Sequence, residues 1–158
     1  MGEKKLRPIT VVIADDERQR VRTCLRLLRV ARGIRVVGKA STAGDAIAAA
    51  SLRPHVLLFD LKMARGNGVS PLLVLKAKSP RTKIILLTGR ASETQILRVI
   101  AHGARGYLGA KLLPRFLVKA VRAVDAGESW VSRTMVTKII DQLARLNAEA
   151  ARTNFSLV

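Results

Sequence analysis

The fold can be inferred outward from the stretch His55-Val56-Leu57-Leu58-Phe59-Asp60-Leu61-Lys62-Met63-Ala64-Arg65-Gly66-Asn67-Gly68. Its apolar run is too short for a helix and predicts a strand that is buried on both faces, as in a parallel sheet. Charge is rare in such strands, so we expect Asp60 where the strand reaches the surface. Because ligands bind at the carboxyl ends of strands in open α/β sheets, Asp60 is a candidate site residue.

The composition is that of one globular domain. The chain has 158 residues, of which 49% are hydrophobic and 25% charged. Cys24 is the only cysteine, which excludes an internal disulfide and is typical of a reducing compartment. No apolar run reaches membrane-spanning length, and Met1 to Pro8 lacks the apolar core of a signal peptide. We therefore expect a cytoplasmic protein without membrane contacts.

The charge is strongly basic. Lys and Arg number 29 against 11 Asp and Glu, which gives a formal net charge of +18. Such an excess favours anionic partners, namely nucleic acid, phosphate groups or an acidic protein face. The alternative is a solvated basic surface, because the basic residues are spread over the whole chain without a dense block. Both interpretations stay open.

Short apolar or β-branched runs alternate five times with amphipathic helical patterns. Strands are expected at residues 9–14, 34–40, 56–60, 83–87 and 103–108. Helices are expected at residues 18–31, 43–52, 70–78, 93–101 and from 114 onward. This order predicts an α/β fold with a parallel sheet covered on both faces. A further helix is expected over about 132–150, and Asn154 to Val158 should fray.

Polar or special residues stand where the expected strands end. They are Asp15, Asp16, Asp60, Thr88 and Tyr107, with the loop that leads to Lys111. The ends of parallel strands share one edge, so these residues should converge there. Three converging carboxylates repel each other, and a hard divalent cation such as Mg²⁺ would relieve the repulsion.

This group of residue types is suited to phosphoryl chemistry. A carboxylate can act as the nucleophile that forms an acyl phosphate. A hydroxyl such as that of Thr88 can donate to a phosphoryl oxygen, and an ammonium group can offset its charge.

Residues 9 to about 127 resemble the response-regulator receiver family, whose members are CheY-like. The motifs that carry the resemblance are Ile13-Ala14-Asp15-Asp16, Asp60 to Gly68 with Met63, Thr88-Gly89, and Gly103 to Leu108 with Tyr107. The segment Gly127 to Ser132 is similar to the one that closes receivers of the NarL/FixJ subfamily.

The resemblance implies a flavodoxin-like (βα)5 doubly wound parallel sheet with strand order 2-1-3-4-5, plus a C-terminal extra helix. Residues 1–127 would form the receiver domain, and residues 128–158 a linker helix with a frayed tail. The output domain that normally follows would be absent from this chain. Transcription would then be controlled, and DNA contacted, only through that missing domain, and homodimerisation is expected.

The resemblance also assigns roles. Asp60 would accept a phosphoryl group from a sensor histidine kinase or a phosphotransfer protein. The implied Mg²⁺ ligands are Asp15, Asp16, Asp60 and the backbone carbonyl of Lys62. Thr88 and Tyr107 would switch the face formed by the fourth helix, fifth strand and fifth helix. The chain's own chemistry would amount at most to self-phosphorylation and hydrolysis of the aspartyl phosphate.

The sequence departs from the family pattern where a lysine is usual, three places after Tyr107. That place is Ala110, and Lys111 follows one residue later as a displaced candidate for the phosphate partner. Ala64 replaces the usual proline after Met63. The alternatives are a receiver-like interaction or dimerisation module that does not use phosphate and, less favoured, a direct nucleic-acid binder.

Four arginines form a stripe at helical spacing beside the acidic residues. They are Arg18, Arg22, Arg26 and Arg29. The stripe is either a solvated face or a docking surface for an acidic kinase or phosphotransfer partner. His55 and His102 are expected to be structural, and Trp130 is expected to anchor the last helix.

Overall fold

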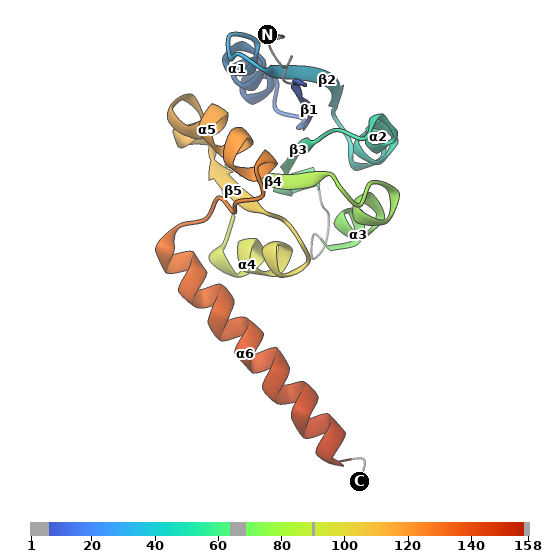
Figure 1. Ribbon diagram of the computed structural model, residues 1–158, viewed down its shortest axis with the longest axis vertical. Helices are drawn as coiled ribbons and strands as arrows, with labels where there is room; N and C mark the ends of the chain where they lie inside the picture. Colours follow the sequence, from blue (N-terminus) through green and yellow to red (C-terminus); the bar gives the residue numbers. More distant parts are fainter. Residues whose placement is uncertain (1–6, 64–68, 90, 157–158) are drawn as a thin grey trace, which may run out of the picture.

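The computed structural model describes residues 7–63, 69–89 and 91–156. Five parallel strands form one sheet in the order β2-β1-β3-β4-β5 (Figure 1). They are β1 Ile9–Ala14, β2 Ile34–Ala40, β3 Val56–Asp60, β4 Lys83–Thr88 and β5 Gly106–Gly109. The expected α/β fold and its strand order are therefore confirmed.

Helices cover both faces of the sheet (Figure 1). They are α1 Arg18–Arg29, α2 Ala43–Ala49, α3 Val69–Lys78, α4 Glu93–Ala101, α5 Leu113–Asp125 and α6 Arg133–Ser156. Helices α1 and α5 lie side by side on one face, whereas α2, α3 and α4 form the other layer. Every crossover thus places one helix between two parallel strands, as a doubly wound sheet requires.

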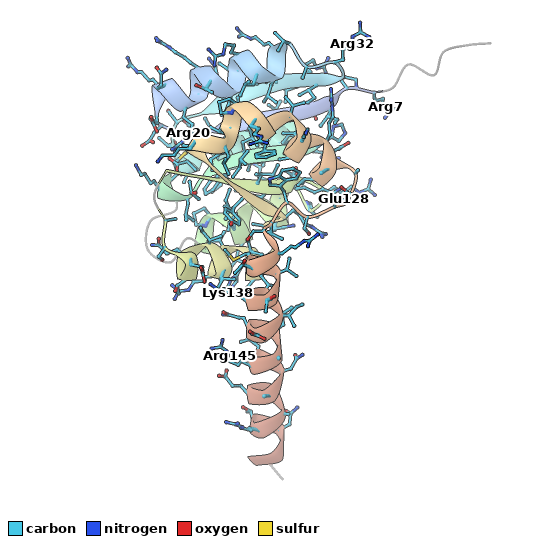
Figure 2. All side chains as sticks on the ribbon, turned by 90° about the vertical axis from the view of Figure 1, so that its left-hand side faces the viewer. Arg7, Arg20, Arg32, Glu128, Lys138 and Arg145 are labelled. Carbon is cyan, nitrogen blue, oxygen red and sulfur yellow. The ribbon has the colours of Figure 1, made fainter. Side chains whose placement is uncertain are left out.

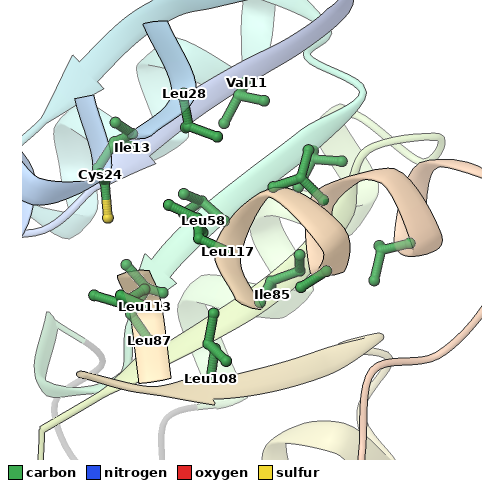
Figure 3. Packing of buried hydrophobic residues seen from close by; sticks show 14 residues of the cluster. Val11, Ile13, Cys24, Leu28, Leu58, Ile85, Leu87, Leu108, Leu113 and Leu117 are labelled. Carbon is green, nitrogen blue, oxygen red and sulfur yellow. The ribbon is translucent and has the colours of Figure 1, made fainter. Parts of the chain in front are cut away.

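Alternate strand residues build two cores. In β3, Val56 and Leu58 face α1 and α5, where they pack with Leu117 (Figure 3). Leu57 and Phe59 face the opposite layer. All four are buried, which confirms that this strand is covered on both faces.

The strand register brings the carboxyl ends together. Asp60, the last residue of β3, pairs with Leu87 of β4, and Thr88 pairs with Gly109 of β5. Asp15 directly follows β1, which lies on the other side of β3. The polar residues that end these strands therefore share one edge, as the sequence predicts.

Helix α2 and strand β5 are shorter than the sequence predicts. Helix α2 gives way to a short 3-10 turn, and Arg53 then adopts a left-handed conformation with φ of 48°. Arg53 precedes Pro54, and a residue before proline is disfavoured in the α region. Strand β5 begins at Gly106 and not at Gly103, whose φ of 109° is incompatible with a strand.

The end of the chain is also more ordered than expected, because α6 continues through Asn154 to Ser156. Each added helical residue closes one backbone hydrogen bond, so the helix continues without an apolar stripe at its end. The sequence interpretations that concern residues 1–6, Ala64 to Gly68 and residues 157–158 lie outside the described residues.

Trp130 connects the segment before α6 to the sheet. Its ring lies 5.9 Å from that of Phe116, and its backbone forms a parallel bridge with Gly106. The backbone N–H of Trp130 donates to Arg105, and that of Tyr107 donates to Trp130. Trp130 thus ties this segment to β5 and α5, and it is the segment that leads into α6.

The first turns of α6 pack on the described part of the domain. Met135 is buried, and Lys138 forms an ion pair with Glu93 of α4. Beyond these residues α6 runs clear of the domain, as the position of Arg145 shows (Figure 2). No described helix combines the length and the hydropathy that a membrane crossing requires.

Candidate functional site

Two buried carboxylates meet at the carboxyl edge of the sheet. Asp15 is 3% exposed and Asp60 is fully buried, so the expectation that Asp60 reaches the surface is wrong. Ile13 and Leu58 face α1 and α5, and Asp15 and Asp60 each follow two residues later, so they lie on the same face of the sheet. Asp16 is exposed, and oxygen atoms of Asp15, Asp16 and Asp60 lie within 4.8 Å of one another.

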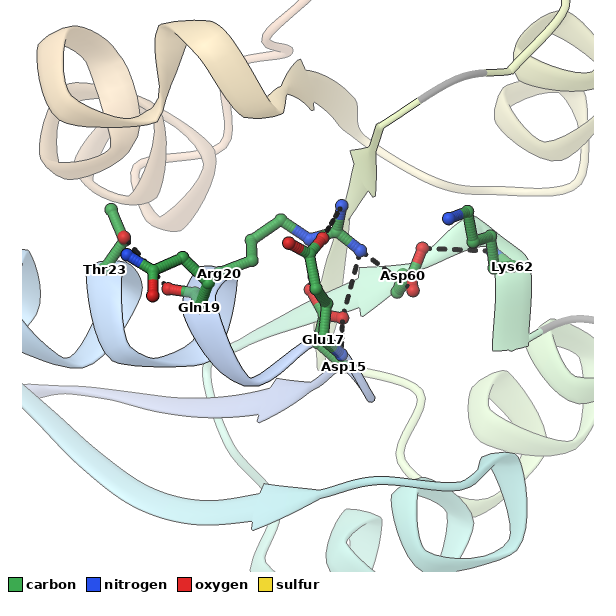
Figure 4. Close-up of polar contacts among 7 residues, drawn as sticks. All are labelled: Asp15, Glu17, Gln19, Arg20, Thr23, Asp60 and Lys62. Atoms are coloured by element: carbon green, nitrogen blue, oxygen red, sulfur yellow. Dashed lines mark hydrogen bonds and ion pairs between the residues drawn. The ribbon is translucent and has the colours of Figure 1, made fainter.

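The cation in this pocket is Arg20, which comes from α1 (Figure 4). Its Nε donates to Asp15 Oδ2, and its Nη2 donates to Asp15 Oδ1 at 3.0 Å. Nη2 also lies 2.9 Å from Asp60 Oδ2, an ion-pair contact without hydrogen-bond geometry. Nη1 lies 3.1 Å from Glu17 Oε2 at the rim. One guanidinium therefore joins three carboxylates.

Arg20 was missed in the sequence, although its spacing carried a signal. Arg20, Cys24 and Leu28 are the buried residues of α1 and recur every four positions. An arginine on the apolar stripe of a helix points toward the core and requires a partner there. Arg20 lies between the arginines of the exposed stripe in sequence, but it belongs to the buried face of α1.

The two oxygens of Asp60 differ in their surroundings. Oδ1 accepts a hydrogen bond of 3.0 Å from the backbone N–H of Lys62, whereas Oδ2 is buried and accepts none. Burial raises the pKa of Asp60 to about 6; the Lys62 N–H lowers it, and the charge of Asp15 raises it further. A carboxylate with one oxygen fixed by a hydrogen bond and one oxygen that accepts none is suited to attack an electrophile.

Thr88 shares a small cavity with Asp60. The cavity has a volume of about 170 Å³ and is also lined by Lys62, Gly89 and Gln95. Thr88 is buried at the end of β4. Tyr107 is half-buried on β5 and packs against the core beneath α3 and α4. A change at Thr88 thus occurs beside α4, the helix that follows it.

Lys111 does not reach Asp60 in this structure. It is exposed in the 3-10 turn Ala110–Leu112, and among the described residues no hydrogen bond or ion pair joins it to Asp60. A role for Lys111 as phosphate partner stays a prediction. The buried positive charge comes from Arg20 of α1 instead.

The donor atoms of the pocket fit a hard divalent cation. Three carboxylates from two neighbouring strand ends supply oxygen ligands, and Asp60 Oδ2 has no hydrogen-bond donor. Mg²⁺ prefers such oxygen ligands and keeps several waters, for which the exposed side of Asp16 leaves room. The contacts of Arg20 use the same oxygens.

The other residues singled out in the sequence have local roles. His55 Nδ1 accepts a hydrogen bond of 2.9 Å from the Thr10 N–H, and His102 Nδ1 lies 2.7 Å from the Arg98 carbonyl oxygen. Both histidines are therefore structural, as expected. The arginines of the stripe are all exposed, which is compatible with either interpretation: Arg18, Arg22, Arg26 and Arg29.

The five-stranded parallel sheet, with its acidic pocket at the carboxyl ends of the strands, is that of a response regulator receiver. The family model of the response regulator receiver domain matches residues 11–122, and the chain belongs to this family. It is a receiver of two-component signalling, and it has the acidic pocket at which receivers generally bind Mg²⁺.

The similar curated proteins are regulators of the NarL type. The chain is 32% identical over 147 residues to the nitrate/nitrite response regulator protein NarL of Escherichia coli K12, covering 92% of this chain and 67% of NarL. It is 33% identical to the uncharacterized transcriptional regulatory protein YxjL of Bacillus subtilis, covering 92% of this chain and 66% of YxjL. The chain thus spans about two thirds of the length of these relatives.

Solved receivers have the same architecture. The isolated REC domain of RcsB from Salmonella enterica superposes with a TM-score of 0.73 at 25% identity, covering 84% of this chain and 98% of that one.

Proposed function

We propose that this receiver accepts a phosphoryl group on Asp60 from a phosphohistidine of a sensor histidine kinase or phosphotransfer protein. The observation that carries the proposal is the state of the Asp60 carboxylate. The Lys62 N–H holds Oδ1, and Oδ2 has no hydrogen-bond donor at the edge where Asp15 and Thr88 also lie.

The transfer would be a displacement at phosphorus. Asp60 Oδ2 supplies the electron pair of the new P–O bond, while the P–N bond to the donor imidazole breaks and its electron pair leaves with the imidazole. Thr88 is placed to donate its hydroxyl to a phosphoryl oxygen, because both residues line the same cavity.

The residues proposed to hold Mg²⁺ are Asp15, Asp16 and Asp60, with the backbone carbonyl of Lys62. The proximity of the carboxylate oxygens, within 4.8 Å of one another, supports this assignment. When bound, the ion would offset the charge that the phosphoryl group brings to a carboxylate-rich pocket.

The signal would leave the site through Thr88 and Tyr107. Movement of Thr88 toward the phosphoryl group would free space beneath α4, and Tyr107 would turn inward from its half-buried position. The face of α4, β5 and α5 would then bind a second copy or an output domain. Residues 1–127 are proposed as the receiver and residues 128–158 as the linker, since the relatives extend beyond the matched region. Contact with DNA and control of transcription would belong to that further part.

Direct phosphorylation tests this proposal. The chain is incubated with Mg²⁺ and phosphoramidate or acetyl phosphate, and the intact mass is measured. We expect the wild-type protein to gain one phosphoryl group, which chelation of the metal prevents. Asp60→Asn should gain none, and Asp45→Asn, which changes an exposed carboxylate at α2, should label as the wild type does. Equal labelling of Asp60→Asn would refute the proposal.

A second candidate is a receiver that binds its partner without phosphorylation. It is favoured by Arg20, which already pairs with Asp15 and Asp60, and by the exposed position of Lys111. In this case no phosphoryl group is gained from either donor, and the oligomeric state is the same in wild type and Asp60→Asn. A stable label on Asp60 would count against it.

A further inference from the structure

Arg20 is a buried arginine in the place where a metal-binding pocket needs room for a cation. Its side chain is 3% exposed, and its contacts with Asp15 and Asp60 use oxygens that are also the proposed metal ligands. The fork of a guanidinium matches carboxylate geometry, so these contacts satisfy two buried charges without any ion. The structure thus shows a pocket in which one guanidinium already offsets part of the carboxylate charge.

We propose that Arg20 is an internal counter-ion that competes with Mg²⁺ for Asp15 and Asp60, so that metal binding requires the guanidinium to leave the pocket. The competition rests on the proposed function, because it assumes that the divalent cation binds at these carboxylates. It assigns Arg20 a positioning and regulatory role, since Arg20 acts through the carboxylates and not on the phosphoryl group.

Charge and space both exclude simultaneous occupation. A guanidinium and a divalent cation repel each other strongly at short range in a buried site. Arg20 Nη2 lies 3.0 Å from Asp15 Oδ1 and 2.9 Å from Asp60 Oδ2, so it occupies the space between two of the carboxylates that would hold the ion. Arg20 also lies close to the residue that follows β4, because a Cβ atom added at Gly89 would be 3.2 Å from Arg20 Nη1.

The rim offers a place for the displaced side chain. Glu17 is half-exposed, and its Oε2 already lies 3.1 Å from Arg20 Nη1. A rotation of the Arg20 side chain toward solvent would keep this partner while it releases Asp15 and Asp60. The apparent metal affinity is then the intrinsic affinity multiplied by the fraction of molecules in which Arg20 is displaced.

Binding of Mg²⁺ to variants measures this competition. The dissociation constant is determined by isothermal titration calorimetry at neutral pH for wild type, Arg20→Met, Arg20→Lys and Arg26→Met. We expect Arg20→Met to bind Mg²⁺ at least tenfold more tightly than wild type. A tenfold change corresponds to a wild-type protein in which Arg20 occupies the pocket in nine molecules of ten. Arg20→Lys should lie between them, because an ammonium keeps the charge but not the fork.

Arg26→Met is the matched control, since it removes the same charge from an exposed position of the same helix. It should bind Mg²⁺ as the wild type does. Unchanged or weaker binding by Arg20→Met would overturn the competition while leaving the metal site intact. Absence of binding in every protein would refute the metal site itself, and the competition with it.

The wild-type protein provides a test that does not depend on the folding of a variant. The Nε–Hε resonance of Arg20 is followed by NMR during a Mg²⁺ titration, with the backbone amides of Asp16 and Lys62 as reporters of binding. We expect the Arg20 resonance to move, in step with these amides, to the position of exposed arginines. An unchanged Arg20 resonance while both amides shift would overturn the proposal.

Discussion

Gly106 of β5 lies directly against Trp130, and the two residues form a parallel backbone bridge. A Cβ atom at Gly106 would lie 2.7 Å from the Trp130 carbonyl oxygen and 2.8 Å from its Cβ. The absence of a side chain at Gly106 therefore permits the segment before α6 to join the edge of the sheet.

Gly106→Ala is expected to separate this segment from β5. The backbone atoms of Trp130 cannot move aside while the bridge to β5 is kept, so the substitution should lower the free energy of unfolding by about 1–3 kcal/mol. The Trp130 fluorescence should shift to that of a more exposed indole. Gly109→Ala is the control in the same strand, because a Cβ atom there meets nothing within 4 Å. If both variants have equal stability, the close approach does not matter.

Asp60→Asn is expected to stabilise the metal-free domain in a pH-dependent way. Burial raises the pKa of Asp60 from 3.8 in the reference state to about 6, so the folded protein binds more protons than the unfolded chain between these values. Stability therefore falls as the pH rises through this window. Asp60→Asn should exceed the wild type in free energy of unfolding by about 1–3 kcal/mol at pH 7.5, and by clearly less at pH 4.5.

Urea unfolding at several pH values, with Mg²⁺ chelated, measures this difference. Asp16→Asn is the control, because it removes an exposed carboxylate from the same edge of the sheet, and it should not reproduce the stabilisation by Asp60→Asn at pH 7.5. A difference for Asp60→Asn that stays constant from pH 4.5 to 7.5 would contradict the burial argument.

Cys24 should resist alkylation in the folded protein. It is fully buried on α1, and burial together with the charge of Asp15 raises its pKa to about 12. Because the thiolate is the nucleophile, iodoacetamide at pH 8 should leave the native protein unlabelled. In urea the same thiol should react fully, and mass spectrometry reports both. Rapid labelling without urea would mean that α1 opens readily.

The far part of α6 should contribute little to the stability of the domain. Apart from half-buried Gln142, residues 141–154 of α6 are exposed, whereas Met135 is buried near its start. Deletion of residues 141–158 should change the free energy of unfolding by less than about 0.5 kcal/mol. Deletion of residues 132–158 also removes Met135 and should destabilise the domain clearly. Destabilisation by the shorter deletion that is as large as that by the longer one would contradict this prediction.

The order of the elements and the meeting of the strand ends could be predicted from the amino-acid sequence. Alternation in β3 and the helical stripes are local patterns, and the parallel sheet that they imply brings Asp15, Asp60 and Thr88 to one edge. The motifs around these residues were sufficient to identify a receiver.

Which cation enters the pocket depends on tertiary packing. The family pattern points to Lys111, yet the rotation of α1 on the sheet directs Arg20 at Asp15 and Asp60. The position of the charged group of a long side chain depends on how two elements pack against each other. Local sequence spacing alone does not predict this packing. The burial of Asp60 also depends on this docking, because the Arg20 side chain of α1 lies against Asp60 at the end of β3.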